Sequence, residues 1–176
     1  MVVYPPSSTR LIRLSEGHLL NIPIYATTQK RSSLGITCSE LGLDQHPSTQ
    51  TAAHVDKSAF SMWVPEIQSA FSVGGPREVA IVGIESHICV TQTTLDLLAN
   101  GHRVYVLADG VSSCNQEEIP VALRRLAKAG AVVTTSESFI YEIMGDAGIT
   151  AFRGIAGLVK ETKESTKDTM QTLCKI

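Results

Sequence analysis

The chain has 176 residues, of which 43% are hydrophobic and 18% charged, and its formal net charge at pH 7 is −2. This composition is typical of one globular domain, and the charge lacks the basic surplus expected of a nucleic-acid-binding protein. No apolar run approaches the roughly 20 residues that a membrane span requires, and residues 1–10 carry no signal-peptide pattern.

The four cysteines are widely spaced and form no Cys-x-x-Cys pair; they are Cys38, Cys89, Cys114 and Cys174. This spacing argues against a disulfide framework or a zinc site and favours reduced thiols. The histidines show no metal-ligand spacing either, so we expect no metal and no other cofactor. The sequence therefore predicts an intracellular protein, cytoplasmic or mitochondrial, that does not enter a membrane and does not take nucleic acid as a partner.

Apolar periodicity predicts helices that alternate with strands. The first half of the chain is expected to hold a helix over 8–20, a strand over 22–27, a long polar loop over 28–58 and a helix over 62–71. A loop of that length in a compact domain is usually functional or mobile. The nearly continuous apolar run over 78–84 is typical of a strand buried on both faces.

The second half continues the alternation, beginning with a helix over 86–99 that has Ser86 as its N-cap. Further strands are expected over 103–108 and 131–134, and further helices over 116–128, 136–144 and 152–160. This order predicts a doubly wound, Rossmann-like three-layer α-β-α sandwich with a mostly parallel sheet. We expect a single domain over 1–160, followed by a loosely held polar tail over 161–176.

Cys89 stands where chemistry is expected in such a fold, because ligands bind outside the carboxyl ends of the strands. With Ser86 as N-cap, Cys89 lies in the first helical turn, where the helix dipole and free backbone N–H groups stabilise a thiolate. The same N–H groups could hold an oxyanion, as hydrolysis by a cysteine nucleophile requires. Position alone leaves an alternative open, in which Cys89 is a small buried hydrophobe facing the sheet.

The segment GIESHICVTQTTLDLLANGHRVYVLADGVSS (83–113) resembles the signature region of the isochorismatase-like cysteine hydrolases. In that family a strand ends in Gly-Ile or Gly-Val, a short turn leads to the nucleophilic Cys, and Asp-Gly/Ala-x-x-Ser follows the next strand. Lys57 in KSAFSMW and the closing TTSESFIYEIMGDA extend the resemblance over nearly the whole chain. The chain looks closest to the isochorismatase domain-containing branch, some members of which are labelled mitochondrial-associated ribonucleases.

The resemblance implies roles for particular residues. Cys89 matches the nucleophile of the family's Asp-Lys-Cys triad, and Lys57 matches its lysine; without the resemblance, Lys57 would be read as a solvated loop residue. A non-proline cis peptide is implied between Ile84 and Glu85, with the backbone N–H groups of Glu85 and Cys89 as oxyanion donors. The residues expected to line the pocket are Ile84, Ser86, Phe60 and Gln29.

The triad's Asp, at the end of the family's first strand, has no counterpart in this sequence. Loss of that central strand would leave backbone groups unpaired at about 1–3 kcal/mol each. We therefore expect that about 20 native residues precede the given sequence. In the alternative, residues 1–4 form a frayed strand and the triad is incomplete. Asp56 and Asp109 are weaker candidates for the base, and Asp109 is better explained as a partner of a neighbouring backbone amide.

Three other residues near these motifs are assigned non-catalytic roles. His87 lies two residues before Cys89 and so faces another side of the helix, which predicts pocket lining or surface rather than a Cys/His dyad. Trp63 is expected in a subunit contact or over a substrate, and Cys114 is expected to be a spectator thiol.

The leading hypothesis is a hydrolase in which Cys89 attacks a small amide-like or ester-like carbonyl substrate with the assistance of Lys57. One alternative is a catalytically degenerate scaffold, which the missing Asp favours. Another is a ribonuclease, against which the acidic charge argues. Members of the resembling family are usually homo-oligomers, so we expect a dimer or a larger assembly.

Overall fold

The computed structural model describes residues 20, 22–41, 43, 51–72 and 74–174. The predicted helix over 8–20 falls, apart from residue 20, outside these ranges, as do residues 1–4, the alternative frayed strand. Within the described part of the chain, no helix is both long enough and apolar enough to cross a membrane.

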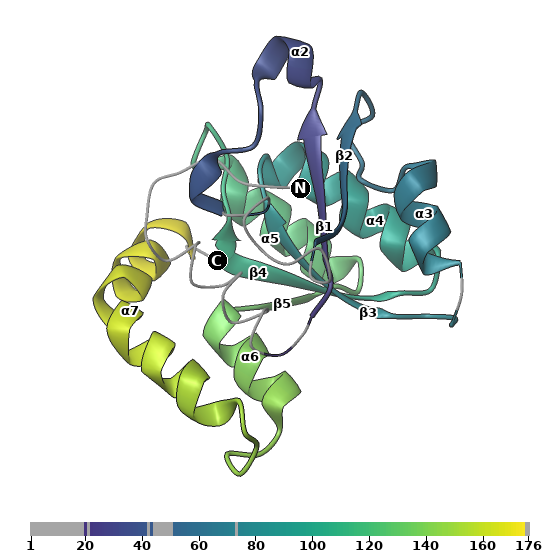
Figure 1. The fold of residues 1–176 in the computed structure, drawn as a ribbon. Coiled ribbons are helices and arrows are strands. Elements are labelled where there is room, and N and C mark those ends of the chain that lie inside the picture. Colours follow the sequence, from purple (N-terminus) through teal and green to yellow (C-terminus); the bar gives the residue numbers. More distant parts are fainter. Residues whose placement is uncertain (1–19, 21, 42, 44–50, 73, 175–176) are drawn as a thin grey trace.

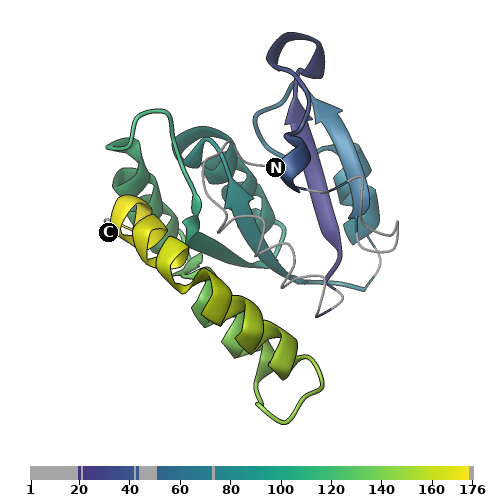
Figure 2. The same cartoon turned by 60° about the vertical axis from the view of Figure 1, so that its left-hand side comes forward.

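The strands of the described residues form two parallel sheets. β1 (Ile24–Gln29) pairs with β2 (Thr51–Lys57), and β3 (Glu78–Gly83), β4 (Arg103–Val111) and β5 (Val132–Thr134) pair in that order. Figure 1 labels these strands, and in Figure 2 the pair β1 and β2 stands to one side of the sheet of β3, β4 and β5. Every strand pair is parallel, so the carboxyl ends of neighbouring strands lie at one edge of each sheet.

Side chains of β4 alternate between two cores, which shows that both faces of this sheet are covered. Val104 and Val106 pack with α4 (Thr91–Ala99) and α5 (Glu118–Lys128). Tyr105 pairs with Phe139 of α6 (Ser136–Met144) and shares its core with Ile155 of α7 (Phe152–Leu173). Each buried side chain of this size contributes about 1.5–3 kcal/mol, which accounts for the nearly continuous apolar sequence of β4. The doubly wound α-β-α prediction is confirmed.

One strand lies where the sequence predicts a loop. The polar stretch 28–58 contains β2, together with α2 (Arg31–Leu34) and the 3-10 helix η1 (Ser39–Leu41). Among the described strands β2 pairs only with β1, and a strand paired on one side tolerates polar and half-exposed side chains. Its apolar alternation is therefore too weak to separate it from a loop.

The C-terminal helix is longer than the sequence predicts. Where a polar tail was expected over 161–176, α7 continues to Leu173, and Thr162 and Thr169 are buried. Their hydroxyls donate to the carbonyls of Leu158 and Ser165, both at 2.8 Å. These bonds within the helix satisfy the buried hydroxyls, which lets a Thr-rich segment pack as a helix.

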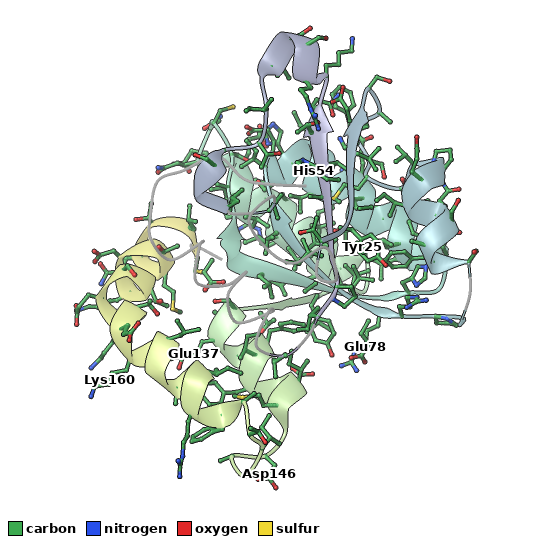
Figure 3. All side chains as sticks on the ribbon, viewed as in Figure 1. Tyr25, His54, Glu78, Glu137, Asp146 and Lys160 are labelled. Atoms are coloured by element: carbon green, nitrogen blue, oxygen red, sulfur yellow. The ribbon has the colours of Figure 1, made fainter. Side chains whose placement is uncertain are left out.

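The remaining helix begins three residues later than predicted. α3 (Pro65–Phe71) has its proline in the first turn, where the fixed φ of proline suits a helix and its missing N–H costs nothing. Figure 3 places Tyr25 of β1 and His54 of β2 on the side of the molecule opposite Lys160 of α7.

Candidate active site

Lys57 is a buried and fixed charge at the carboxyl end of β2. Its side chain is only 7% exposed, and its Nζ donates to Gln29 Oε1 at 2.6 Å and to the carbonyls of Ala59 and Phe60 at 2.9 Å. An ammonium group has three N–H donors, so these acceptors use all of them. The structure thus excludes the reading of Lys57 as a solvated loop lysine.

Cys89 shares an electrostatic environment with Lys57. Burial lowers the pKa of Lys57 below its ordinary value, while the negative charges of the Cys89 thiolate and the Asp56 carboxylate oppose that decrease. Cys89 itself is half-buried against the core that contains β3, β4 and α4. The two residues that the resemblance singled out are therefore close enough to interact through their charges.

Gln29 holds Lys57 in place. The parallel register sets Gln29 opposite Lys57, and the Gln29 Nε2 donates to the carbonyl of Ser58 at 2.7 Å. This bond fixes the amide so that its oxygen faces the ammonium. Gln29 was predicted only to line a pocket, and sequence spacing gives no signal for its contact with Lys57 because the two residues are 28 positions apart.

Asp56 supports α2, which extends beyond the end of β1 in Figure 1. Its Oδ1 accepts from Arg31 N at 2.9 Å and from Thr28 Oγ1 at 2.8 Å. The hydrogen bond from the Arg31 backbone, followed by that from the Thr28 hydroxyl, lowers the pKa of Asp56. A carboxylate stabilised in this way is a weaker base, which argues against Asp56 as the substitute for the missing Asp.

The turn that carries Cys89 follows directly from β3. Gly83 has φ 134°, a conformation that favours glycine and allows the sharp exit from the strand. The expected cis peptide between Ile84 and Glu85 is present. The carbonyl of Glu85 then accepts from Ile88 N and Val90 N, both at 3.1 Å, the donors on either side of Cys89.

The helix start differs from the prediction. Ser86–Val90 forms a π-helical turn, η2, with Glu85 as its N-cap, and α4 begins only at Thr91. Ser86 was predicted to be the N-cap, which is wrong because its hydroxyl bonds Ser113 instead of a helix N–H. Cys89 is consequently the fourth residue of the turn and not the third. Ser86 is also fully buried, so it supports the turn from beneath and has no exposed surface to line a pocket.

The loop after β4 clamps this turn through its backbone. Ser86 N donates to the carbonyl of Ser112 at 2.9 Å, and Ser112 N donates to the carbonyl of Gly83 at 3.1 Å. Cys114 N donates to the Glu85 carboxylate at 2.7 Å. The Glu85 side chain thus ties the exit of β3 to the exit of β4. In the sequence, the only indication of this contact is that a charged residue, Glu85, directly follows an apolar strand.

Ser113 adds side-chain contacts to the same clamp. Its Oγ accepts from Ser86 N at 3.1 Å and also bonds the Ser86 hydroxyl and, at 3.0 Å, His87 Nδ1. The same His87 nitrogen lies 4.0 Å from the Glu85 carboxylate. Ser113 is the last residue of the Asp-Gly-x-x-Ser motif, and its side-chain contacts were not predicted from the sequence.

Asp109, at the other end of that motif, fixes the start of α6. It is fully buried, and its carboxylate accepts from Ser136 N at 2.9 Å and Ser136 Oγ at 2.8 Å. This confirms the prediction that Asp109 bonds a neighbouring backbone amide. The next residue is a glycine because no larger side chain fits there: a Cβ at position 110 would lie only 2.7 Å from Val82 Cγ1.

The aromatic residues after Lys57 separate into one exposed and one packed side chain. Phe60 is 51% exposed, so its predicted place beside a substrate stays a prediction. Trp63 lies 5.5 Å from Phe71 and 5.3 Å from His102 between ring centroids, in edge-on contacts that include Tyr25 through Phe71. Trp63 is therefore part of an aromatic cluster packed against the core, but it is only partly buried, so its predicted place in a subunit contact or over a substrate stays a prediction.

No group of three or more potential ligands (His, Cys, Asp or Glu) that could hold a metal ion occurs among the described residues. What the site offers is a half-buried thiol, a buried ammonium with fixed acceptors, and a turn clamped from two strands. This combination suits a thiolate nucleophile, because a nearby fixed cation stabilises the ionised sulfur.

Comparison with known proteins gives one consistent family. Residues 10–138 match the family model described as the isochorismatase domain. A secreted isochorismatase effector of Phytophthora sojae is 41% identical over 152 residues, which cover 84% of this chain and 71% of the relative. Isochorismatase domain-containing protein 1 of Salmo salar is 37% identical over 150 residues, 84% of this chain but only 51% of the relative.

Solved structures agree with this assignment. The MAR1 ribonuclease of Caenorhabditis elegans is similar with a TM-score of 0.75 at 32% identity, covering 86% of this chain and 77% of that one. The YcaC gene product of Escherichia coli, an octameric hydrolase of unknown specificity, has a TM-score of 0.75 at 19% identity, covering 97% and 85%. At that lower identity the second likeness shows the fold alone.

Proposed function

The chain belongs to the isochorismatase family, and from this premise we propose that it is a hydrolase with Cys89 as nucleophile and Lys57 as assisting cation. The substrate class is a small amide-like or ester-like carbonyl compound. The observation that carries the proposal is the charge interaction between Cys89 and a buried Lys57 whose N–H groups are held by fixed acceptors.

The proposed reaction proceeds in two halves. The Cys89 thiolate attacks the carbonyl carbon, and the N–H groups of Glu85 and Cys89 hold the resulting oxyanion. Lys57 gives up one of its three hydrogen bonds and transfers that proton to the departing amine or alkoxide, which leaves a thioester on Cys89 and a neutral lysine amine. Water then attacks the thioester, the amine takes up its proton, and the thiolate is released. The lowered pKa of Lys57 supports this double use, because it eases both release and return of the proton.

Thiol alkylation followed by mass spectrometry tests the proposal. Cys114 is exposed and Cys38 and Cys174 are half-buried, so they report how exposure alone affects the rate. We expect half-buried Cys89 to react faster than exposed Cys114, with a pH profile that breaks well below the free-thiol pKa of about 8.5. A Cys89 that reacts more slowly than Cys114, or that titrates as a free thiol, contradicts the hydrolase and supports the catalytically degenerate scaffold.

A ribonuclease is the second candidate, and one comparison favours it, since the similar Caenorhabditis elegans structure carries that name. The net charge of −2 opposes it, because binding to a polyanion draws on Lys and Arg contacts. RNA binding that weakens steeply with salt, together with cleavage lost in Cys89→Ala, would favour this reading over the small-molecule hydrolase.

We also propose that the chain assembles into a homo-oligomer of two or more copies. Leu34 and Ile36, at and just after the projecting α2, are 68% and 79% exposed, and exposed apolar side chains favour association. The octameric YcaC gene product gives a precedent within the fold. A monomer in light scattering at micromolar concentration contradicts this proposal.

For location, we propose the cytoplasm, with mitochondria as the alternative. The wide spacing of the four cysteines, which form no Cys-x-x-Cys pair, supports a reducing compartment. The Phytophthora sojae relative is labelled secreted, so recovery of this protein from culture medium, and not from the cell fraction, is the result that contradicts the proposal.

A further inference from the structure

Three side chains connect the partly exposed surface with the base of the Cys89 turn. His87 is 26% exposed, Ser113 is 8% exposed and Ser86 is fully buried. The His87 Nδ1 lies 3.0 Å from Ser113 Oγ, which in turn bonds the hydroxyl of Ser86. A change in the protonation of the imidazole can therefore alter the hydrogen bonding of Ser86, the first residue of η2, through direct side-chain contacts.

The hydrogen-bond directions in this chain have two complete arrangements. Ser113 Oγ already accepts from Ser86 N, so it has one further acceptor site and one proton to donate. When His87 Nδ1 accepts, Ser113 donates to it and the Ser86 hydroxyl donates to Ser113. When Nδ1 carries a proton, it donates to Ser113, which then donates to Ser86. Both arrangements use every site on Ser113, but only the second frees the Ser86 proton for another acceptor.

We propose that His87 is a positioning residue for the nucleophile, whose protonation reverses the Ser113–Ser86 hydrogen bond and thereby makes the reactivity of Cys89 depend on pH. The proposal rests on the proposed function of Cys89. Ser86 and Cys89 lie three positions apart on the same five-residue π-helical turn. A freed Ser86 hydroxyl and a positive His87 both stabilise a thiolate on the same turn.

The titratable groups around His87 come from both elements that meet there. Glu85 precedes it on its own turn, with the carboxylate 4.0 Å away, and Cys89 follows it. The loop after β4 contributes Cys114, whose N–H donates to that carboxylate. Lys57 acts on the same turn through its charge interaction with Cys89. Histidine is the side chain whose protonation ordinarily changes between about pH 5 and pH 8, so the experiment varies the pH over that range.

The experiment measures the alkylation rate of Cys89 and the amide chemical shift of Ser86 by NMR between about pH 5 and pH 8 in the full chain. In the wild type we expect the rate near pH 5.5 to exceed a single-ionisation curve by about threefold or more. The Ser86 amide should titrate with the same midpoint. Both effects should vanish in His87→Gln, which keeps a polar side chain but has no titrating ring.

Two further variants separate the link from a general effect on folding. His54→Gln changes a histidine that bonds Thr37 at 2.9 Å, away from the clamp, and should leave the Cys89 profile unchanged. Ser113→Ala retains the imidazole but should uncouple the Ser86 amide from it. A single-ionisation profile in the wild type, or an inflection that survives His87→Gln, overturns the proposal. A Cys89 that never ionises in this range instead overturns the proposed function, and the Ser86 amide then decides for or against the His87 link by itself.

Discussion

Lys57 and Gln29 face each other across the parallel register of β1 and β2, and the Lys57 ammonium donates to the Gln29 amide oxygen at 2.6 Å. The Gln29 amide nitrogen is held in turn by the carbonyl of Ser58. A pair of adjacent strand ends thus fixes the position of the lysine that interacts electrostatically with Cys89. Placement on strands, not on a loop, gives the site its rigidity.

Gln29→Ala should lower activity more than it lowers stability. The variant removes one of three acceptors of a buried ammonium, and hydrogen bonds to charged groups contribute about 1.5–3 kcal/mol. If most of this hydrogen-bond free energy is lost in the transition state, the alkylation rate of Cys89 and any kcat/KM should fall by about tenfold or more.

Gln29→Glu is the matched control, because it keeps an oxygen in nearly the same place and adds a negative charge. It should raise the pKa of Lys57 relative to the wild type and slow the reaction through proton retention, while the fold stays intact. Activity equal to the wild type in both variants would show that Gln29 does not position Lys57.

Lys57 should make stability rise with pH under alkaline conditions. Burial lowers the pKa of folded Lys57 below the ordinary 10.5, whereas the unfolded chain holds its proton up to that value. Unfolding therefore takes up a proton between the two pKa values, and stability increases as pH rises through this window. Urea unfolding of the wild type and of Lys57→Met at several pH values should show a free-energy difference that grows in favour of the wild type toward pH 10.5.

The exposed Lys160 on α7 offers the control for this measurement. Lys160→Met removes the same charge from a solvated position, where folding changes the environment little, so its difference from the wild type should stay flat. A flat difference for Lys57→Met as well would mean that the ammonium is not desolvated in the folded protein.

The sequence predicts the region from β3 to α6 well, because β4 is buried on both faces and its neighbours carry clear apolar patterns, although β3 is partly exposed. The bounds of α6 agree with the prediction of 136–144. β2 escapes prediction for the opposite reason, since it is half-exposed and carries His54 and Asp56 among small residues. The extension of α7 escapes because its buried threonines resemble a solvated tail until their helix bonds are seen.

Within the site, the sequence identifies residues that belong to a motif and misses the contacts between motifs. Cys89 and Lys57 are found through the resemblance, and their charge interaction agrees with that pairing. The bonds of Ser113 to Ser86 and of Gln29 to Lys57 join positions 27 and 28 residues apart. Contacts between residues this far apart produce no periodic pattern in the sequence, so they are seen only in the folded structure.

Phe71→Ala should destabilise the protein by about 2–4 kcal/mol, as deletion of a large packed aromatic side chain usually does. The ring of Phe71 contacts Tyr25 of β1 at 5.2 Å and His102, which precedes β4, at 5.4 Å between centroids. It therefore links the two sheets through α3. Phe60→Ala removes a ring that is 51% exposed and should cost less than about 0.5 kcal/mol. Equal unfolding free energies for the two variants would contradict a structural role for the aromatic cluster.

Asp109→Asn should lower stability by about 1.5–3 kcal/mol, because the buried carboxylate accepts two bonds from Ser136 and an amide can accept through only one oxygen. Ser136→Ala removes the hydroxyl bond but keeps the backbone bond, so its effect should be smaller. If Asp109 were instead the catalytic base, Asp109→Asn would abolish turnover with little change in unfolding free energy, and Ser136→Ala would leave turnover nearly intact. Thermal unfolding and Cys89 alkylation measured on both variants therefore separate the two roles, and we expect the pattern of a residue that holds α6.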